Sequence, residues 1–201
     1  SGSCAGCAET AYARLVTQVC GERMYVSNAT GCSSIWGGPA ATSPYTVNKD
    51  GKGVAWANSL FEDNAEHGLG IHLGQKAIRN ALADKTRALL AIEWTYAPLK
   101  EAAQKWLDTM DDGEANAEAT KAYIAALEDG LMTVDEVVAF TSSPDAAKVF
   151  GDQLPQFQAH AKELKESGAK YCDCDACKLV KEILDEKDYL AKKSVWIFGG
   201  D

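Results

Sequence analysis

The first third of the chain contains the stretches CAGCAE (residues 4–9) and NATGCSSIWGG (residues 28–38), which together hold three cysteines among small residues. A Cys-x-x-Cys pair such as Cys4 and Cys7 can place two sulfurs on one metal centre. Cys32 follows a predicted strand and can reach the same centre from elsewhere in the fold. These are three of the four thiolates that a cubane iron–sulfur cluster needs. The spacing by itself leaves zinc, a redox dithiol and a disulfide open.

The pattern around these cysteines predicts an α/β domain, a parallel sheet flanked by helices. Helical and extended segments alternate: a helix over 9–20, a strand over 23–28, a loop over 31–55, a helical region over 59–93 and a strand over 193–198. Two short strands separated by helices are typical of this class. Cys32 then lies at the carboxyl end of the first strand, where open α/β sheets bind their ligands.

Between these parts, residues 95–190 are predicted to form a helical insert. Pro98 can open a helix, and a second helix is expected over 114–128. Thr133 to Glu136 and Ser143 to Asp145 are typical of helix N-termini. The predicted organisation is therefore three segments: 1–94, the insert over 95–190, and a final strand over 191–201.

Composition excludes several classes of protein. The 201 residues are 46% hydrophobic and 24% charged, which is ordinary for a globular domain with a core of its own. The sequence lacks a long apolar run and the basic, apolar start of a signal peptide, so we expect no membrane span. A net charge of −9 argues against nucleic acid as a partner. Seven cysteines, an odd number, favour reduced thiols in a cytoplasm over a disulfide scaffold.

Several motifs in sequence order resemble one known family. They are CAGCAE (4–9), LVTQ (15–18), NATGCSSIWGG (28–38), PYT (44–46), WANSLFEDNAE (56–66) and WIFGGD (196–201). The chain closely resembles the C-terminal thiamine-diphosphate domain of pyruvate:ferredoxin (flavodoxin) oxidoreductase in its large single-chain form. The resemblance is dense over residues 3–70, fades over about 75–190 and returns at the end.

The resemblance implies a set of ligands. Cys4, Cys7 and Cys32 would bind a [4Fe–4S] cluster next to the thiamine, with a fourth cysteine supplied from a downstream segment. Glu9 and Cys32 would contact thiamine diphosphate, although Ala8 stands where the family has glycine. Gly200 and Asp201 would open the motif that holds Mg²⁺ on the diphosphate, with Asp201 as a metal ligand.

The resemblance also implies an activity for the whole enzyme. Pyruvate would be oxidatively decarboxylated with coenzyme A to acetyl-CoA and CO2, and the electrons would pass through [4Fe–4S] clusters to ferredoxin or flavodoxin. The family is cytoplasmic and forms homodimers. Its remaining catalytic groups lie elsewhere, so no catalytic residue is assigned here. We expect this chain to need the rest of a longer chain, and to be inactive and without an intact cluster alone.

Cys172, Cys174 and Cys177 form a second group, Cys-x-Cys-x-x-Cys, before an amphipathic helix. They could hold zinc, with His160 as a further ligand, or form a redox pair. We favour incidental thiols, because the spacing does not match the family's other clusters. The alternative to the enzyme is a non-catalytic metal- or redox-binding helical module that uses these thiols. Cys20 is predicted to lie in the core, and the histidines at 67 and 72 to be packing or surface residues.

Overall fold

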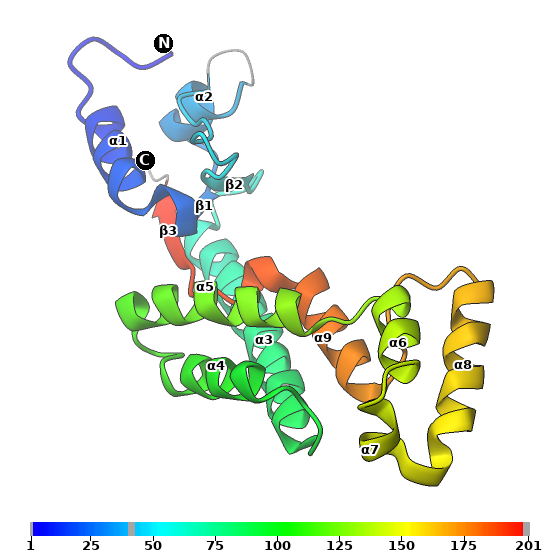
Figure 1. Ribbon diagram of the computed structural model, residues 1–201. Helices are drawn as coiled ribbons and strands as arrows, with labels where there is room; N and C mark the ends of the chain where they lie inside the picture. The colour runs from blue at the N-terminus through cyan, green and yellow to red at the C-terminus, as the bar shows by residue number, and fades with distance from the viewer. Residues whose placement is uncertain (1, 40–42, 199–201) are drawn as a thin grey trace. The chain divides into compact units, whose positions relative to one another are not determined.

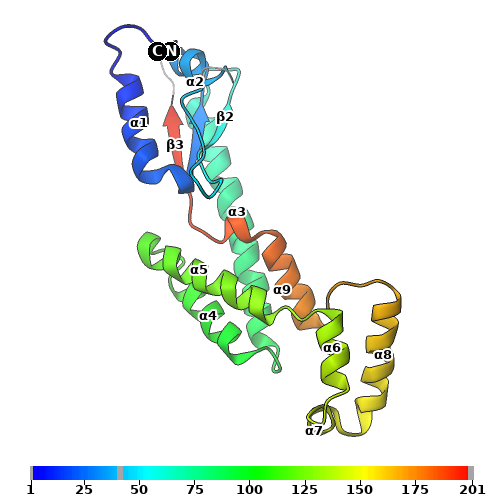
Figure 2. The ribbon, with the colours of Figure 1, turned by 45° about the horizontal axis from the view of Figure 1, so that its top comes forward.

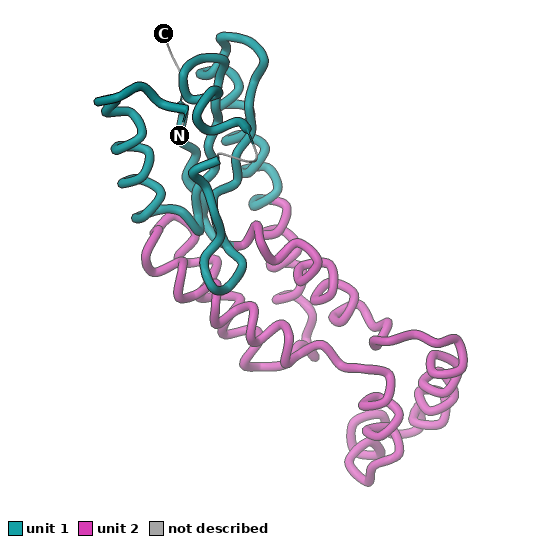
Figure 3. The backbone as a smooth tube through the Cα atoms, turned by 90° about the horizontal axis from the view of Figure 1, so that it is seen from above, with its two compact units in different colours: residues 1–80, 191–201 teal, residues 81–190 magenta. Residues whose placement is uncertain are grey.

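The computed structural model describes residues 2–39 and 43–198. The chain divides into two compact units, one of residues up to 80 together with those from 191, the other of residues 81–190 (Figure 3). We call them unit 1 and unit 2. The organisation predicted from the sequence, with boundaries at 94/95 and 190/191, remains a proposal about domains.

Unit 1 is built around a parallel sheet. Its elements are α1 (Glu9–Cys20), η1 (Gly21–Arg23), β1 (Met24–Asn28), α2 (Cys32–Gly37), β2 (Ala55–Asn58), the first part of α3 (Asn64–Ala91) and β3 (Ser194–Phe198). The strand order is β2-β1-β3, and both pairings are parallel (Figures 1 and 2). The predicted α/β class is confirmed, and a parallel sheet flanked by helices is consistent with part of a thiamine-diphosphate-binding fold.

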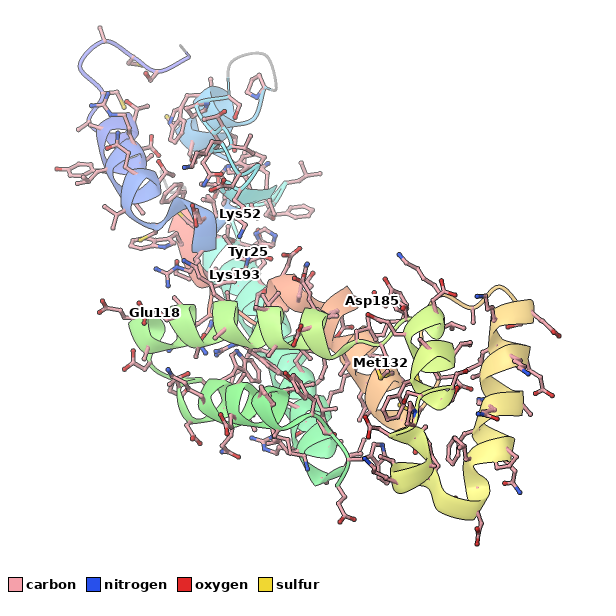
Figure 4. All side chains as sticks on the ribbon, viewed as in Figure 1. Tyr25, Lys52, Glu118, Met132, Asp185 and Lys193 are labelled. Atoms are coloured by element: carbon pink, nitrogen blue, oxygen red, sulfur yellow. The ribbon has the colours of Figure 1, made fainter. Side chains whose placement is uncertain are left out.

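The central strand β1 is the most buried part of the sheet. Val26 pairs with Trp56 of β2 on one side and with Trp196 of β3 on the other. Both edges of β1 are thus paired, and its side chains are covered where they project from the faces of the sheet; Val26 is 1% exposed. At the start of β3, Lys193 Nζ lies 5.8 Å from the centroid of the Tyr25 ring; both residues are labelled in Figure 4.

The first turns of α3 pack on the sheet through a glycine. A Cβ added at Gly68 would lie only 2.7 Å from Ile197 Cγ1 of β3. One residue earlier, His67 Nδ1 lies 2.8 Å from Ser27 Oγ of β1. The absence of a side chain at Gly68 therefore lets the helix approach the strands closely. His67 is a packing residue and His72 is exposed, as predicted.

Replacing Gly74 by alanine is expected to stabilise the chain. Glycine in a helix interior costs about 0.5–1 kcal/mol relative to alanine. An added Cβ at Gly74 would meet no atom within 4 Å, so this gain is not opposed by a clash. Urea denaturation followed by circular dichroism measures the change. Gly68→Ala is the matched control, because Ile197 must move to admit it; an equal gain at both positions would contradict this account.

Helix α2 and strand β2 were not predicted. The first lies within the predicted loop over 31–55, and the second begins at its last residue. Helix α2 spans six residues between Gly31 and Gly38, and β2 spans four residues that include two alanines. Alanine and asparagine are poor strand formers, and so short a helix has little propensity of its own. Pairing with β1 stabilises β2, and the burial of Trp36, 3% exposed, anchors α2.

Unit 2 is helical throughout its described elements. They are the second part of α3, α4 (Ala97–Asp108), α5 (Gly113–Gly130), α6 (Val134–Thr141), α7 (Ala146–Phe150), η2 (Gly151–Gln153), α8 (Leu154–Glu166), α9 (Asp175–Asp185) and η3 (Lys187–Tyr189). The predicted helical insert is thus observed, and the predicted start at Thr133 is a complete capping box with Glu136. Hydrogen bonds from Thr133 to the Glu136 carboxylate hold the pKa of that group below its usual range.

Two packed groups of helices make up this unit. Helices α4 and α5 pack together, and α5 also contacts α9. The core there includes Trp106 and Tyr123, both 0% exposed. Helices α6, α7 and α8 pack on one another, with the Phe150 and Phe157 rings stacked at 4.2 Å. Within the described residues no helix is both long enough and apolar enough to cross a membrane.

Candidate functional site

The carboxyl end of β1 is held by a buried polar network. The Asn28 side chain is 0% exposed, and the two protons of its Nδ2 are shared among three acceptors: Ala29 O at 2.9 Å, Ser34 Oγ at 3.0 Å and Asn58 Oδ1 at 2.6 Å. The Ser34 hydroxyl donates to Ala29 O at 2.8 Å. These bonds tie the ends of β1 and β2 to α2. They therefore hold Cys32, the first residue of α2, at the carboxyl edge of the sheet.

The N-terminal segment lies against the same helix. Cys4 and Cys7 form a turn in which the Cys7 N–H donates to Cys4 O at 3.1 Å. Upstream, a Cβ added at Gly2 would lie 3.2 Å from Trp36 Cα. Downstream, Trp36 Nε1 donates to Glu9 Oε2 at 3.1 Å. The segment that contains the paired cysteines is thus held to α2 on both sides of the pair.

The predicted ligands differ in how far the structure describes them. Cys4 and Cys32 are exposed and Cys7 is half-buried, so all three sulfurs are accessible. They do not form a group whose sulfurs all lie within 4.8 Å of one another; a cubane does not require this, because each of its thiolates binds a different iron. Gly200 and Asp201 lie outside the described residues. The ligand roles of all five remain predictions.

A cavity of about 320 Å³ opens between α1, Trp36 and the segment at Pro44 and Tyr45. Burial, followed by the negative charge of Glu9, raises the pKa of Tyr45 to about 12. The Tyr45 hydroxyl and Trp56 Nε1 are buried and have no hydrogen-bond partner among the described residues. The cavity is thus walled by two aromatic side chains, Trp36 and Tyr45, together with residues of α1 that include Arg14.

In unit 2 the structure brings together the second group of thiols. Among the described residues, Cys172, Cys174 and Cys177 are the one group of three or more potential metal ligands whose donor atoms all lie within 4.8 Å. His160 does not belong to it; its Nε2 lies 2.9 Å from Asp173 Oδ1. From the sequence we favoured incidental thiols, that is, cysteines without a shared role. That interpretation does not predict that the three sulfurs converge. The Cys-x-Cys-x-x-Cys spacing at a helix start was the available signal.

The three thiols differ in their proton affinity. Hydrogen bonds from the Cys172 and Cys177 side chains hold the pKa of the Cys174 thiol well below its usual range. Cys174 is also the N-cap of α9, where the helix dipole favours a thiolate. Hydrogen bonding to the other two thiols raises the pKa of Cys177, which is only 6% exposed. Cys20, predicted as core, is half-buried.

Unit 1 is a parallel sheet in which a cysteine-bearing helix, α2, follows the carboxyl end of the central strand. This makes it an α/β domain whose candidate site lies at the carboxyl edge of the sheet. No family model matches the chain. Curated relatives do match it over its whole length. The pyruvate-flavodoxin oxidoreductase of Klebsiella pneumoniae is 40% identical over 201 residues, and the pyruvate:ferredoxin oxidoreductase of Moorella thermoacetica is 39% identical. The chain belongs to the pyruvate:ferredoxin (flavodoxin) oxidoreductase family, as its motifs predicted.

A third relative has a different name. The NADP-dependent pyruvate dehydrogenase of Cryptosporidium parvum is 36% identical over 227 aligned positions that include the whole chain. The chain spans 13%, 14% and 10% of the length of these three relatives. The comparison therefore bears on a small part of each enzyme, and the activity of the whole belongs to the proposal that follows.

Proposed function

We propose that this chain forms part of the thiamine-diphosphate and iron–sulfur domain of an enzyme that oxidatively decarboxylates pyruvate. The products would be acetyl-CoA, made with coenzyme A, and CO2, and ferredoxin or flavodoxin would accept the electrons. The single observation that supports this most is homology over the whole chain to enzymes named for pyruvate, ferredoxin and flavodoxin. The accessible thiols of Cys4, Cys7 and Cys32 are three of the four thiolates that such a role requires.

In this proposal Cys4, Cys7 and Cys32 hold a [4Fe–4S] cluster, and a cysteine from another part of the enzyme completes it. Bound thiamine diphosphate supplies a nucleophilic carbon and the cluster a one-electron acceptor. Glu9 faces the cofactor beside Trp36, whose indole orients its carboxylate. The Asn28 network keeps α2, and with it Cys32, in place as the cluster changes charge.

Further parts of the proposal lie beyond the described residues. Gly200 and Asp201 would begin the diphosphate site, with Asp201 on Mg²⁺, since a carboxylate oxygen is a ligand that this ion prefers. A homodimer in the cytoplasm is the assembly that we propose for the complete enzyme.

Replacing Cys32 by serine in the complete enzyme is expected to remove one cluster. Iron and acid-labile sulfide should fall by about four atoms each per chain. Pyruvate-dependent reduction of ferredoxin should fall with them, because the first electron acceptor is lost. Cys4→Ser and Cys7→Ser should behave in the same way. Metal analysis and low-temperature electron paramagnetic resonance measure the loss.

Cys20→Ser is the matched control, because this thiol lies at the end of α1 and is no predicted ligand. It should leave the iron content and the activity unchanged. Full iron and sulfide in Cys32→Ser, with the enzyme folded, would overturn the assignment of this cysteine. A different result would overturn the proposed substrate: Cys32→Ser loses iron as expected, but the unaltered enzyme shows no pyruvate-dependent reduction of ferredoxin.

A further inference from the structure

Unit 2 contains a thiol group that the proposed enzyme chemistry does not use. We propose that Cys172, Cys174 and Cys177 bind a single soft divalent metal ion of the zinc type. The proposal concerns unit 2 alone and does not depend on the function proposed for unit 1. It rests on where the three sulfurs lie, on the backbone N–H that donates to one of them and on the frame that holds them.

The spacing of the sulfurs suits one ion. Their mutual distances are all within 4.8 Å. Zinc–thiolate bonds of about 2.3 Å in tetrahedral geometry put two sulfurs about 3.8 Å apart, so small rotations of the side chains close the site. A cubane cluster spreads its thiolates over different irons and holds them farther apart. The geometry therefore favours a mononuclear site over a cluster.

The sulfur of Cys174, the central thiol of the group, accepts a hydrogen bond from a backbone N–H. The Cys177 N–H donates to Cys174 Sγ at 3.5 Å. Such bonds stabilise metal-bound thiolates, because they spread the negative charge that the ion leaves on sulfur.

The frame around the sulfurs is held together by backbone pairing. The Cys172 N–H donates to Met132 O at 2.9 Å, and the Val134 N–H donates to Lys170 O at 3.1 Å. Met132, labelled in Figure 4, lies in the connection between α5 and α6. Cys174 caps α9, whose N-terminal dipole offsets the excess negative charge of three thiolates on a divalent ion. Bound metal would thus fix the segment that is paired with the α5–α6 connection to the start of α9.

Three protein side chains bind the ion in this proposal, and solvent completes its coordination. The other candidate, His160, is paired with Asp173 and does not lie within 4.8 Å of all three sulfurs. The two side chains of this pair are 51% and 42% exposed, so they form a surface contact beside the site. Replacing His160 should therefore have little effect on metal affinity.

Titration of the reduced, chelator-treated chain with Zn²⁺ and with Co²⁺ tests the proposal. The background is the variant Cys4→Ser/Cys7→Ser/Cys32→Ser, so that binding by the three predicted cluster ligands of unit 1 is excluded. We expect one ion per chain, and with Co²⁺ an absorption band for thiolate-to-metal charge transfer. Adding Cys174→Ser or Cys177→Ser should weaken binding by more than the roughly 10–100-fold that loss of an outer partner costs. His160→Ala and Cys20→Ser are the matched controls.

Circular dichroism establishes that each variant is folded, and Zn²⁺ should raise the melting temperature of the background variant but not of Cys174→Ser. Binding of less than one equivalent by a folded chain would overturn the proposal. Three other results would also overturn it. They are metal binding that survives Cys174→Ser, a Cys174–Cys177 disulfide that forms in preference to the metal complex, and reconstitution of these thiols with four irons and sulfide. Cluster loss in Cys32→Ser tests the proposed function separately, since those thiols are absent from this assay.

Discussion

Replacing Trp106 by alanine is expected to lower the free energy of unfolding of unit 2 by about 3–5 kcal/mol, the range for deleting a large buried aromatic side chain. Trp106 is 0% exposed and lies on α4. Its ring packs against Tyr123 of α5 with the centroids 5.6 Å apart, and its Nε1 donates to Leu190 O at 3.2 Å. The substitution leaves a cavity and removes the donor to a buried carbonyl, and the two losses add.

Urea denaturation followed by far-ultraviolet circular dichroism measures this change without using the tryptophan signal. Trp94→Ala is the matched control: the same substitution in the same unit, at a side chain that is 70% exposed, should change stability by about 0.5 kcal/mol or less. Trp106→Phe should fall between the two, because it keeps much of the packing. Equal effects of Trp106→Ala and Trp94→Ala would show that the core of unit 2 is not assembled around Trp106.

Raising the pH from 10 to 12 is expected to destabilise unit 2 through Tyr123. Burial raises the pKa of this side chain to about 12, from 10.0. In that window the unfolded state has lost the phenol proton and the folded state retains it. Stability falls with rising pH wherever the folded state binds more protons, so the contribution is complete below pH 10 and is lost toward pH 12. Two pH units correspond to at most about 2.7 kcal/mol.

Hydrogen bonding supports the retained proton. The Thr86 hydroxyl donates to Leu82 O at 2.8 Å, so the Tyr123 hydroxyl, 3.0 Å away, is the donor to Thr86. Tyr123→Phe should cost about 0.5–1.5 kcal/mol at neutral pH, because this bond is lost. The stability advantage of the unaltered chain over Tyr123→Phe should then shrink as the pH rises through the window, and reverse when the full loss is reached. Denaturation curves whose difference stays constant from pH 10 to 12 would contradict the assignment.

Much of the local structure was predictable because its causes are local. The helix at residues 9–20, the central strand β1 and the edge strand β3 follow from apolar patterning. Thr133 and Glu136 form the capping box that their spacing predicts. Elements stabilised by distant partners were missed: β2 depends on its pairing with β1, and α2 depends on the burial of Trp36. Neither has enough propensity of its own to be recognised.

The candidate sites divide in the same way. The motifs at residues 4–9 and 28–38 identified the family, because metal and cofactor chemistry demands particular side chains at particular spacings, and a sequence records both. The spacing of Cys172, Cys174 and Cys177 was a local signal, but that their sulfurs converge was visible only in three dimensions. The segment that carries them is paired through Cys172 with Met132, about forty residues away, and no local pattern encodes that contact. Residue identity thus determined the family, whereas long-range packing decided which thiols meet.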